Sequence, residues 1–206
     1  MSIGLLVGLG NPGPEYDATR HNAGFWFVTQ FARDHGMGLH LERKFHGHYG
    51  RTGGLHMLLP KTYMNRSGIA VSSLANFYKI PASDILVVHD ELDLPPGEVK
   101  LKFGGGIAGH RGLRDITAAL GTPEFWRLRL GIGHPGERAE VLNFVLRAPP
   151  RDEADAIGAA IDRGLAVMPY LIDGATEKAM LKLHTKAQAQ PAEPPAAPAS
   201  PPRENT

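Results

Sequence analysis

Cysteine is absent from this chain of 206 residues. Its absence excludes disulfide bonds, zinc–thiolate sites and thiol nucleophiles, and it fits the reducing cytosol. Long apolar runs are missing too, because no stretch approaches the roughly 20 apolar residues of a membrane-spanning helix. The short apolar run at the start has no basic residue ahead of it and meets glycine and proline too early for a secretion signal. We therefore expect a soluble cytoplasmic protein that makes no membrane contact.

The chain also lacks an excess of either charge, because 22 basic residues face 21 acidic ones and leave a formal net charge of +1. Any attraction to nucleic acid must therefore come from locally clustered lysine and arginine. The length and an ordinary apolar content predict one globular domain. We place this domain at residues 1–187 and expect residues 188–206, which are dominated by proline and alanine, to form a disordered tail.

Strands and helices are predicted to alternate along the chain. Two buried strands are expected at 3–7 and 85–88, a hairpin around Gly53-Gly54, and two strands with one charged face each at 99–103 and 127–132. One helix is expected to begin near residues 20–22 and to end at Gly36, and a second to pass through residues 69–77. A third is expected after Gly112, and most of residues 139–184 are expected to be helical. The hairpin and the alternating strands require antiparallel pairs. The sequence therefore predicts a single α/β domain with a twisted mixed β-sheet flanked by α-helices.

The loop after the first strand, from Gly8 to Gly13, matches the G-x-G-x-x-G pattern of dinucleotide-binding proteins. Pro12 and Pro14 stiffen this turn, however, and the next helix begins several residues late. No carboxylate ends a second strand about 20 residues further on, where it would bind a ribose. A Rossmann-like nucleotide-binding oxidoreductase is therefore a distant alternative, and it predicts that NAD protects the protein against thermal unfolding.

Two other patterns suggest ligands without completing a site. The glycine-rich loop 104–112 is not a P-loop, because it lacks the G-K-[ST] ending that supplies a lysine and a magnesium-binding hydroxyl. His46 and His48 are the tightest pair among the ten histidines, but neither an H-E-x-x-H pattern nor a third ligand accompanies them. We expect no metal and no organic cofactor.

The residues that remain favour hydrolysis by activated water. Cysteine and a G-x-S-x-G elbow are both missing, and Ser67 is interpreted as part of a helix start. His21 is the natural general base, since it titrates near neutrality and lies at a loop-to-helix junction. Asp90 directly follows a buried strand, where open α/β sheets place ligand crevices. A His21–Asp90 pair would fix the imidazole tautomer, although spacing alone does not establish contact.

Five stretches in this order give the chain a resemblance to one family. It is similar to bacterial peptidyl-tRNA hydrolase from the start to about His184. The resemblance implies an enzyme that needs no metal or cofactor, acts as a monomer, and recycles tRNA from stalled translation by cutting the ester between peptide and tRNA. The stretches are GLGNPGPEYDATRHNAGFWFV (8–28), PKTYMNRSG (60–68), HDELDLPPGEVKLKFGGG (89–106), GHRGLRDI (109–116) and RLRLGIGHPG (127–136).

The resemblance assigns roles around the ester. It implies that His21 deprotonates water and that Asp90 holds and polarises His21. It also implies that Asn11 and Asn65 bind the peptidyl end and orient water, a task that suits amides because they both donate and accept hydrogen bonds. Asn11, which we count with the catalytic residues, is tied to the preference for blocked over free aminoacyl-tRNA. Alternatively, Asn11 shapes a turn and Asn65 caps a helix.

The resemblance also implies contacts to tRNA. Tyr16 and Tyr63 match aromatic positions for the 3′ CCA end, where a ring stacks on an unpaired base, unless they only pack. Lys102 and Arg129 match a clamp for the 5′ phosphate, and strand alternation puts both on charged faces. Solvated surface charges are the alternative for this pair. Gly109 and His110 match the family's G-H-x-G loop, which would lie near the substrate.

One position in that loop departs from the family pattern. Arg111 stands where asparagine hydrogen-bonds substrate and water, and Ile107-Ala108 replaces His-Gly. A guanidinium cannot accept a hydrogen bond, so it does not copy an amide, although it can hold a phosphate. An RNA-binding protein that has lost catalysis is therefore an alternative. The presence of His21, Asp90 and both asparagines argues against that loss.

Overall fold

The computed structural model describes residues 2–185, so the tail expected from residue 188 lies outside the described residues. No helix in this part is long and apolar enough to cross a membrane. Strands and helices alternate as the sequence predicts. The strands are β1 (Leu5–Gly8), β2 (His40–Glu42), β3 (Gly47–Thr52), β4 (Leu55–Pro60), β5 (Ile85–Glu91), β6 (Val99–Phe103) and β7 (Trp126–Gly131). The helices are α1 (Ala23–Asp34), α2 (Ser67–Tyr78), α3 (Arg111–Leu120), α4 (Val141–Val145), α5 (Arg151–Leu165), α6 (Met168–Ile172) and α7 (Thr176–His184). The 3₁₀ turns η1 (Arg20–Asn22), η3 (Met64–Arg66) and η5 (Arg138–Glu140) precede α1, α2 and α4.

The seven strands form one sheet in the order β2-β3-β4-β1-β5-β7-β6. Its central strands are parallel: β1 runs parallel to β4 and β5, and β5 runs parallel to β7. Its two ends are antiparallel, through β2, β3 and β4 on one side and β6 and β7 on the other. The predicted mixed α/β sheet is confirmed. The sequence pattern misses β2, because this strand has only three residues and none of them is buried.

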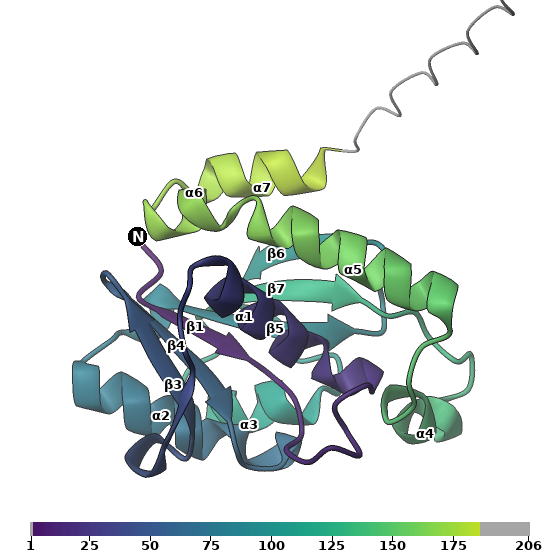
Figure 1. Ribbon diagram of the computed structural model, residues 1–206. Coiled ribbons are helices and arrows are strands. Elements are labelled where there is room, and N and C mark those ends of the chain that lie inside the picture. Colours follow the sequence, from purple (N-terminus) through teal and green to yellow (C-terminus); the bar gives the residue numbers. More distant parts are fainter. Residues whose placement is uncertain (1, 186–206) are drawn as a thin grey trace, which may run out of the picture.

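Helices cover both faces of the sheet and create three layers (Figure 1). Helices α1, α5 and α7 pack on one face, where Phe27 and Leu128 belong to one buried cluster. Helices α2 and α3 pack on the other face, where Leu74 belongs to a second cluster. Strand β5 lies between the layers and is buried along its whole length. Because side chains alternate along a strand, Val88 joins the first cluster and Val87 the second.

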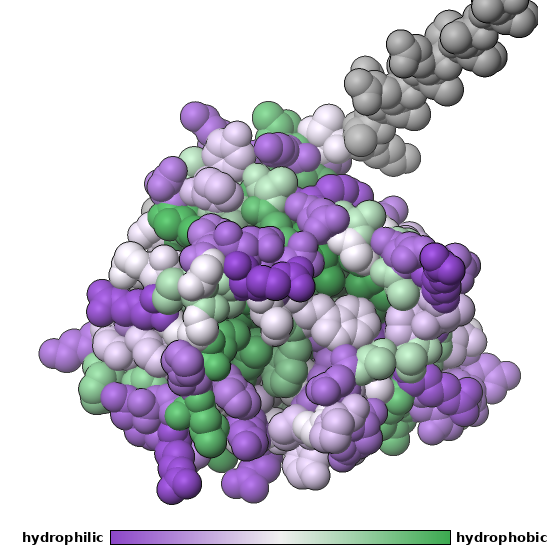
Figure 2. All heavy atoms as spheres, in the orientation of Figure 1, coloured by the Kyte–Doolittle hydropathy of each residue, from purple (hydrophilic) through white to green (hydrophobic). Residues whose placement is uncertain are grey.

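The carboxyl ends of the parallel strands β1, β4, β5 and β7 meet at one edge of the sheet, where open α/β sheets bind ligands. Strand β6 is antiparallel, so the loop 104–110 that follows it must run back along the sheet to reach the start of α3 at the same edge. Figure 2 shows charged and polar side chains spread over the visible face with small apolar groups between them.

Helix α1 lies unusually close to the sheet at Gly24. A Cβ atom placed there would be 2.3 Å from the carbonyl oxygen of Val88 and 2.4 Å from the backbone nitrogen of Leu9. The same backbone makes two hydrogen bonds, from Leu9 N–H to Val88 O at 3.0 Å and from Phe25 N–H to Leu9 O at 3.1 Å. This contact fixes the start of α1, and with it the preceding turn η1, against the ends of β1 and β5.

Two helical glycines make a matched test of this contact. Gly24→Ala should lower the free energy of unfolding by more than about 2 kcal/mol, because the new methyl group meets backbone atoms that cannot move apart. Gly158→Ala in α5 should raise it by about 0.5–1 kcal/mol, because alanine favours helix and nothing lies within 4 Å of that position. Urea unfolding of both variants gives these values. Similar changes in the two variants would contradict the close approach.

Candidate active site

Three polar side chains meet at the carboxyl end of β5. Asp90 lies next to the last residue of β5, His21 lies in η1, and His110 immediately precedes α3. The Nδ1 atom of His21 lies 2.9 and 3.0 Å from the two carboxylate oxygens of Asp90. The Nε2 atom of His110 lies 3.0 Å from Oδ1 of the same carboxylate. Two histidines from distant parts of the chain therefore share one carboxylate.

Hydrogen bonding determines which ring nitrogens carry protons. The backbone N–H of Leu113 donates to Nδ1 of His110 at 3.3 Å, so His110 caps helix α3 with an unprotonated Nδ1. Its Nε2–H is then free to donate to Asp90. An ionised carboxylate only accepts, so His21 donates to it through Nδ1–H. The remaining nitrogen of neutral His21, Nε2, keeps its lone pair and can accept a proton.

Burial and charge act in opposite directions at this site. Burial alone would raise the pKa of Asp90, but the facing His21 and His110 bring that pKa well below its usual range. Burial is also the largest influence on His21 and would lower its pKa. The charge of Asp90 and its hydrogen bond outweigh burial and the nearby cation of Arg111, so the pKa of His21 lies above its usual value of 6.5. Asp90 is thus ionised, and His21 becomes a stronger base.

Two neighbours of His21 anchor it, and sequence reasoning missed both. Arg20 is buried, and its guanidinium lies 2.7 Å from Glu153 of α5 and 4.1 Å from the ring centroid of Phe144. It also donates to one backbone carbonyl in α4 and to two in the segment between α4 and α5, at distances of 3.2–3.3 Å. Asn22 exchanges two hydrogen bonds with the backbone of Asn11, at 2.8 and 3.0 Å. Only the adjacency of these residues to His21 could have signalled their role.

The asparagines and tyrosines gather near the ends of β1 and β4. Asn11 is buried, and its Oδ1 accepts the backbone N–H of Met64 at 2.8 Å, which leaves its amide NH₂ as the group with no partner in the described residues. Asn65 directly follows Met64 in η3 and is exposed. The rings of Tyr16 and Tyr63 lie edge to face with centroids 6.4 Å apart, and Tyr63 is exposed. All four predicted residues thus lie on two adjacent loops at the carboxyl edge. Ser67 begins α2 as expected and donates to Met64 O.

The cluster of His21, Asp90 and His110 opens onto a cavity of about 430 Å³. One wall is the loop and first turn of α3, and the other is formed by η5 and α4. Arg111 is the first residue of α3, exposed at this cavity, and Ala108 has a φ of 44°, a left-handed conformation that favours glycine. The lining residues are His21, Asp90, Glu91, Leu92, Ala108, Gly109, His110, Arg111, Arg114, His134, Arg138, Val141, Leu142 and Val145.

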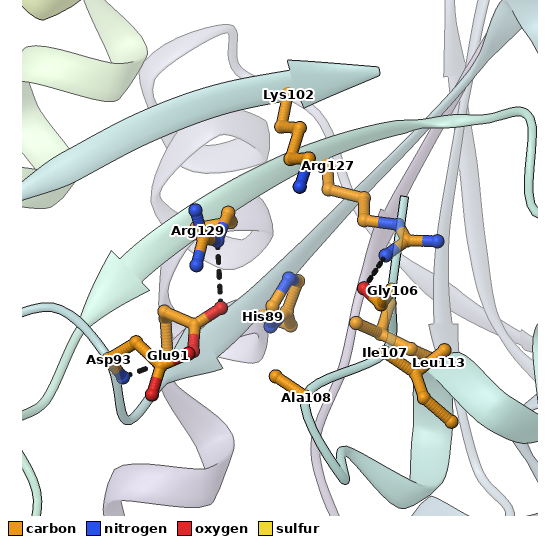
Figure 3. A pocket seen from close by; sticks show the side chains of 10 residues that line it. All are labelled: His89, Glu91, Asp93, Lys102, Gly106, Ile107, Ala108, Leu113, Arg127 and Arg129. Atoms are coloured by element: carbon orange, nitrogen blue, oxygen red, sulfur yellow. Dashed lines mark hydrogen bonds and ion pairs between the residues drawn. The ribbon is translucent and has the colours of Figure 1, made fainter. Parts of the chain in front are cut away.

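A second, smaller pocket of about 190 Å³ adjoins the first (Figure 3). Lys102 from β6 and Arg129 from β7 reach into it, so the two residues predicted as a phosphate clamp lie in one pocket. Nε of Arg129 donates to Oε2 of Glu91 at 2.8 Å, which leaves the two terminal nitrogens of this guanidinium for a ligand. Glu91, which sequence reasoning missed, therefore orients Arg129.

Arg127 lines the same pocket but is turned toward the loop beside it (Figure 3). It is only 2% exposed, and its guanidinium donates to the carbonyl of Gly106. Beside it, burial lowers the pKa of His89 to about 3, and Nδ1 of His89 donates to the carbonyl of Asp90 at 2.7 Å. Neutral His89 adds no charge to this pocket, so Lys102 and Arg129 are its cations available to a ligand.

One group in the described residues has the composition of a metal site. His21, Asp90 and His110 each offer a ligand atom, and these atoms lie within 4.8 Å of one another. Binding a cation through Nε2 of His110 would require the proton to move to Nδ1, where the N–H of Leu113 already donates. The donor set fits proton transfer better than metal binding. The pair His46 and His48 belongs to no such group among the described residues.

The fold and the site define a class of protein. A single α/β domain holds a histidine against an ionised carboxylate, and this histidine lines an open cavity. Enzymes that activate water by general base catalysis use this combination.

Comparisons identify the family. The family model described as peptidyl-tRNA hydrolase matches residues 5–191. A peptidyl-tRNA hydrolase from Methylobacillus flagellatus is 58% identical over 189 residues, which cover 90% of this chain and 98% of that protein. The structure of peptidyl-tRNA hydrolase from Acinetobacter baumannii is 49% identical with a TM-score of 0.87, covering 89% of this chain and 95% of that one. A complex of peptidyl-tRNA hydrolase with N-propanol gives the same TM-score and coverage at 48% identity. This chain belongs to the peptidyl-tRNA hydrolase family, a family of hydrolases in translation, as its motifs predict.

The pKa of His21 tests the electrostatics directly. Asp90→Asn should lower this pKa below 6.5, because burial and the cation of Arg111 then act without the carboxylate. Arg111→Gln should raise the pKa of His21 above its wild-type value, because a repulsive charge is removed. NMR titration of the His21 ring measures both shifts, with His48 on the distant strand β3 as internal control. Shifts of the same sign in the two variants would contradict the assignment.

Proposed function

We propose that this protein cleaves peptidyl-tRNA with a water molecule activated by His21. Membership of the family supports the reaction, and one observation supports the mechanism. His21 lines the cavity of about 430 Å³ and is held through Nδ1 by Asp90, which leaves the lone pair of Nε2 free. A base oriented in this way does not need a nucleophilic side chain.

The proposed reaction moves one proton through His21. Water gives a proton to Nε2 while its oxygen attacks the ester carbonyl carbon, and Asp90 stabilises the imidazolium that forms. The bond between that carbon and the ribose oxygen of the terminal adenosine then breaks. The proton on Nε2 passes to the departing ribose oxygen, so that free peptide and tRNA leave and neutral His21 is restored.

The neighbouring loops are proposed to hold the substrate. The free amide NH₂ of Asn11 suits a carbonyl of the blocked peptidyl end, because Oδ1 of Asn11 is already engaged by Met64. Asn65 lies exposed beside it and is proposed to orient water or peptide. Tyr16 and Tyr63, with Tyr63 exposed, offer ring faces for unpaired bases of the 3′ CCA end.

The smaller pocket is proposed to receive the 5′ phosphate of tRNA. Lys102 supplies a point charge, and Arg129 supplies the two terminal nitrogens that Glu91 leaves free. Neutral His89 at the floor of the pocket does not repel these cations. A phosphate there would fix the acceptor stem relative to His21 and would favour tRNA over short esters.

The proposal extends to location and assembly. We propose a cytoplasmic location, because translation produces peptidyl-tRNA there. One chain supplies His21, Asp90, His110 and the cavity beside them, which supports the proposal of a monomer as the active unit. Residues 1–187 would form the catalytic domain, with residues 188–206 as an appended tail. The first turn after β1 is followed by α1 only at Ala23, which argues against a dinucleotide cofactor on this loop.

Single-turnover cleavage of N-acetyl-aminoacyl-tRNA tests the reaction. The wild type should cleave this ester much faster than unblocked aminoacyl-tRNA, and His21→Ala should reduce the rate by about 10²- to 10⁴-fold, because the general base is lost. The wild-type rate should rise with pH through a midpoint above 6.5, since His21 acts unprotonated and its pKa is raised.

His40→Ala on β2 is the matched control, because this histidine is exposed and lies outside both pockets. The wild-type protein could instead bind tRNA and leave the ester intact. That result would replace this proposal with the alternative suggested by Arg111, an RNA-binding protein that has lost catalysis.

Lys102→Gln tests the phosphate pocket. The variant should lose about 3- to 10-fold in affinity for 5′-phosphorylated tRNA and change little toward tRNA treated with phosphatase, because one phosphate contact disappears. Lys100→Gln is the control, since Lys100 is exposed on the same face of β6 but does not line the pocket. Equal weakening of both tRNA forms by Lys102→Gln would refute the assignment.

A further inference from the structure

Three arginines line the catalytic cavity, and none has a carboxylate partner in the part of the chain that the structure describes. Arg111 and Arg114 come from α3 and Arg138 from η5, and all three are exposed at the cavity. Within the described residues, none of their side chains makes an ion pair or a hydrogen bond to an acidic group. The two carboxylates of the cavity are already engaged, Asp90 by the histidines and Glu91 by Arg129. The cavity therefore carries uncompensated positive charge.

These arginines form one side of a cleft whose other side is apolar. Arg111 and Arg114 are three residues apart, so they lie on the same face of α3. The facing wall is formed by Val141, Leu142 and Val145 of α4, of which Leu142 is exposed. A wall of this kind suits aliphatic and peptide surface, whereas guanidinium groups suit carboxylates, which they bind through two parallel hydrogen bonds. The cleft thus combines the features that recognise an acidic peptide.

We propose that this cleft receives the peptide part of the substrate and favours peptides with acidic side chains close to the ester. The inference rests on the proposed function, because His21 marks where the ester lies. The aromatic rings offered to the CCA end, Tyr16 and Tyr63, do not line this cavity, and the phosphate clamp occupies the adjoining pocket. The cleft between α3 and α4 is therefore left for the peptide.

The position of Arg111 gives this preference a direct link to the chemistry. Its charge acts on His21, where it opposes the effect of Asp90. A carboxylate of the substrate that pairs with Arg111 would offset this repulsion while also anchoring the peptide next to the base. The Arg111 side chain, which cannot replace the asparagine of the family pattern as a hydrogen-bond acceptor, instead supplies a site for an anion.

Matched substrates separate charge from shape. We would compare acetyl-Glu-Ala-tRNA, acetyl-Gln-Ala-tRNA and acetyl-Lys-Ala-tRNA on the same tRNA, with kcat/KM as the readout. The wild type should prefer glutamate to its isosteric amide by about 2- to 5-fold, and lysine should be the poorest, because a partly exposed charge pair gives an effect of this size. Arg111→Gln, Arg114→Gln and Arg138→Gln should each reduce the ratio. Arg33→Gln on α1, which is exposed and outside the cavity, should leave it unchanged.

The outcomes distinguish this proposal from the proposed function. Equal kcat/KM for the three substrates in the wild type would overturn the acidic preference while leaving the hydrolase intact. A uniform loss in Arg111→Gln, whatever the peptide, would show that the guanidinium contacts a tRNA phosphate instead. If no substrate is cleaved, binding of the same three tRNAs still tests the cleft, and equal affinities would overturn the proposal.

Discussion

The site depends on one ionised carboxylate, Asp90, that is almost completely buried. An isolated buried carboxylate would be neutral, because transfer from water disfavours the charged form. Asp90 keeps its charge because His21 and His110 both donate to it, at 2.9 and 3.0 Å. Those contacts require β5 to end between the η1 turn and the start of α3. The close packing of Gly24 against Val88 and Leu9 holds η1 at that distance, so the fold and the electrostatics of the base have the same origin.

The same carboxyl edge of the sheet holds two groups of cationic side chains in two adjoining pockets. In the smaller pocket, Glu91 engages one nitrogen of Arg129 and leaves the two terminal nitrogens for a ligand. In the larger cavity beside His21, Arg111 has no such partner among the described residues, and its charge acts on His21. The two pockets share Glu91 and Ala108, so under the proposed function tRNA phosphate and peptide would be recognised in adjoining parts of one edge. Under the proposal, Arg111 would couple substrate preference to base strength, because its charge lowers the pKa of His21.

Most of the fold could be predicted from the sequence, because long apolar segments and alternation report burial directly. The α/β class, the mixed sheet and the hairpin at Gly53-Gly54 are confirmed, whereas β2 is too short and too exposed to be recognised. The predicted end of a buried strand also indicated Asp90. The contact between Asp90 and His21 could not be predicted, because it depends on how α1 packs against the sheet. Contacts made by covering segments could not be predicted. Arg127 is 2% exposed because the returning loop 104–110 covers it, and alternation reports only its face. Arg20 pairs with Glu153, which lies 133 positions away.

The tautomers of the two histidines test the central claim most directly, because every role assigned to His21 follows from them. ¹⁵N NMR of the neutral rings at high pH should show His21 protonated at Nδ1 with a bare Nε2, and His110 protonated at Nε2 with a bare Nδ1. This result would establish that both rings donate to an ionised Asp90 and that His21 retains a free base. His21 protonated at Nε2, or His110 protonated at Nδ1, would contradict the account, since the shared carboxylate would then lack one of its two donors.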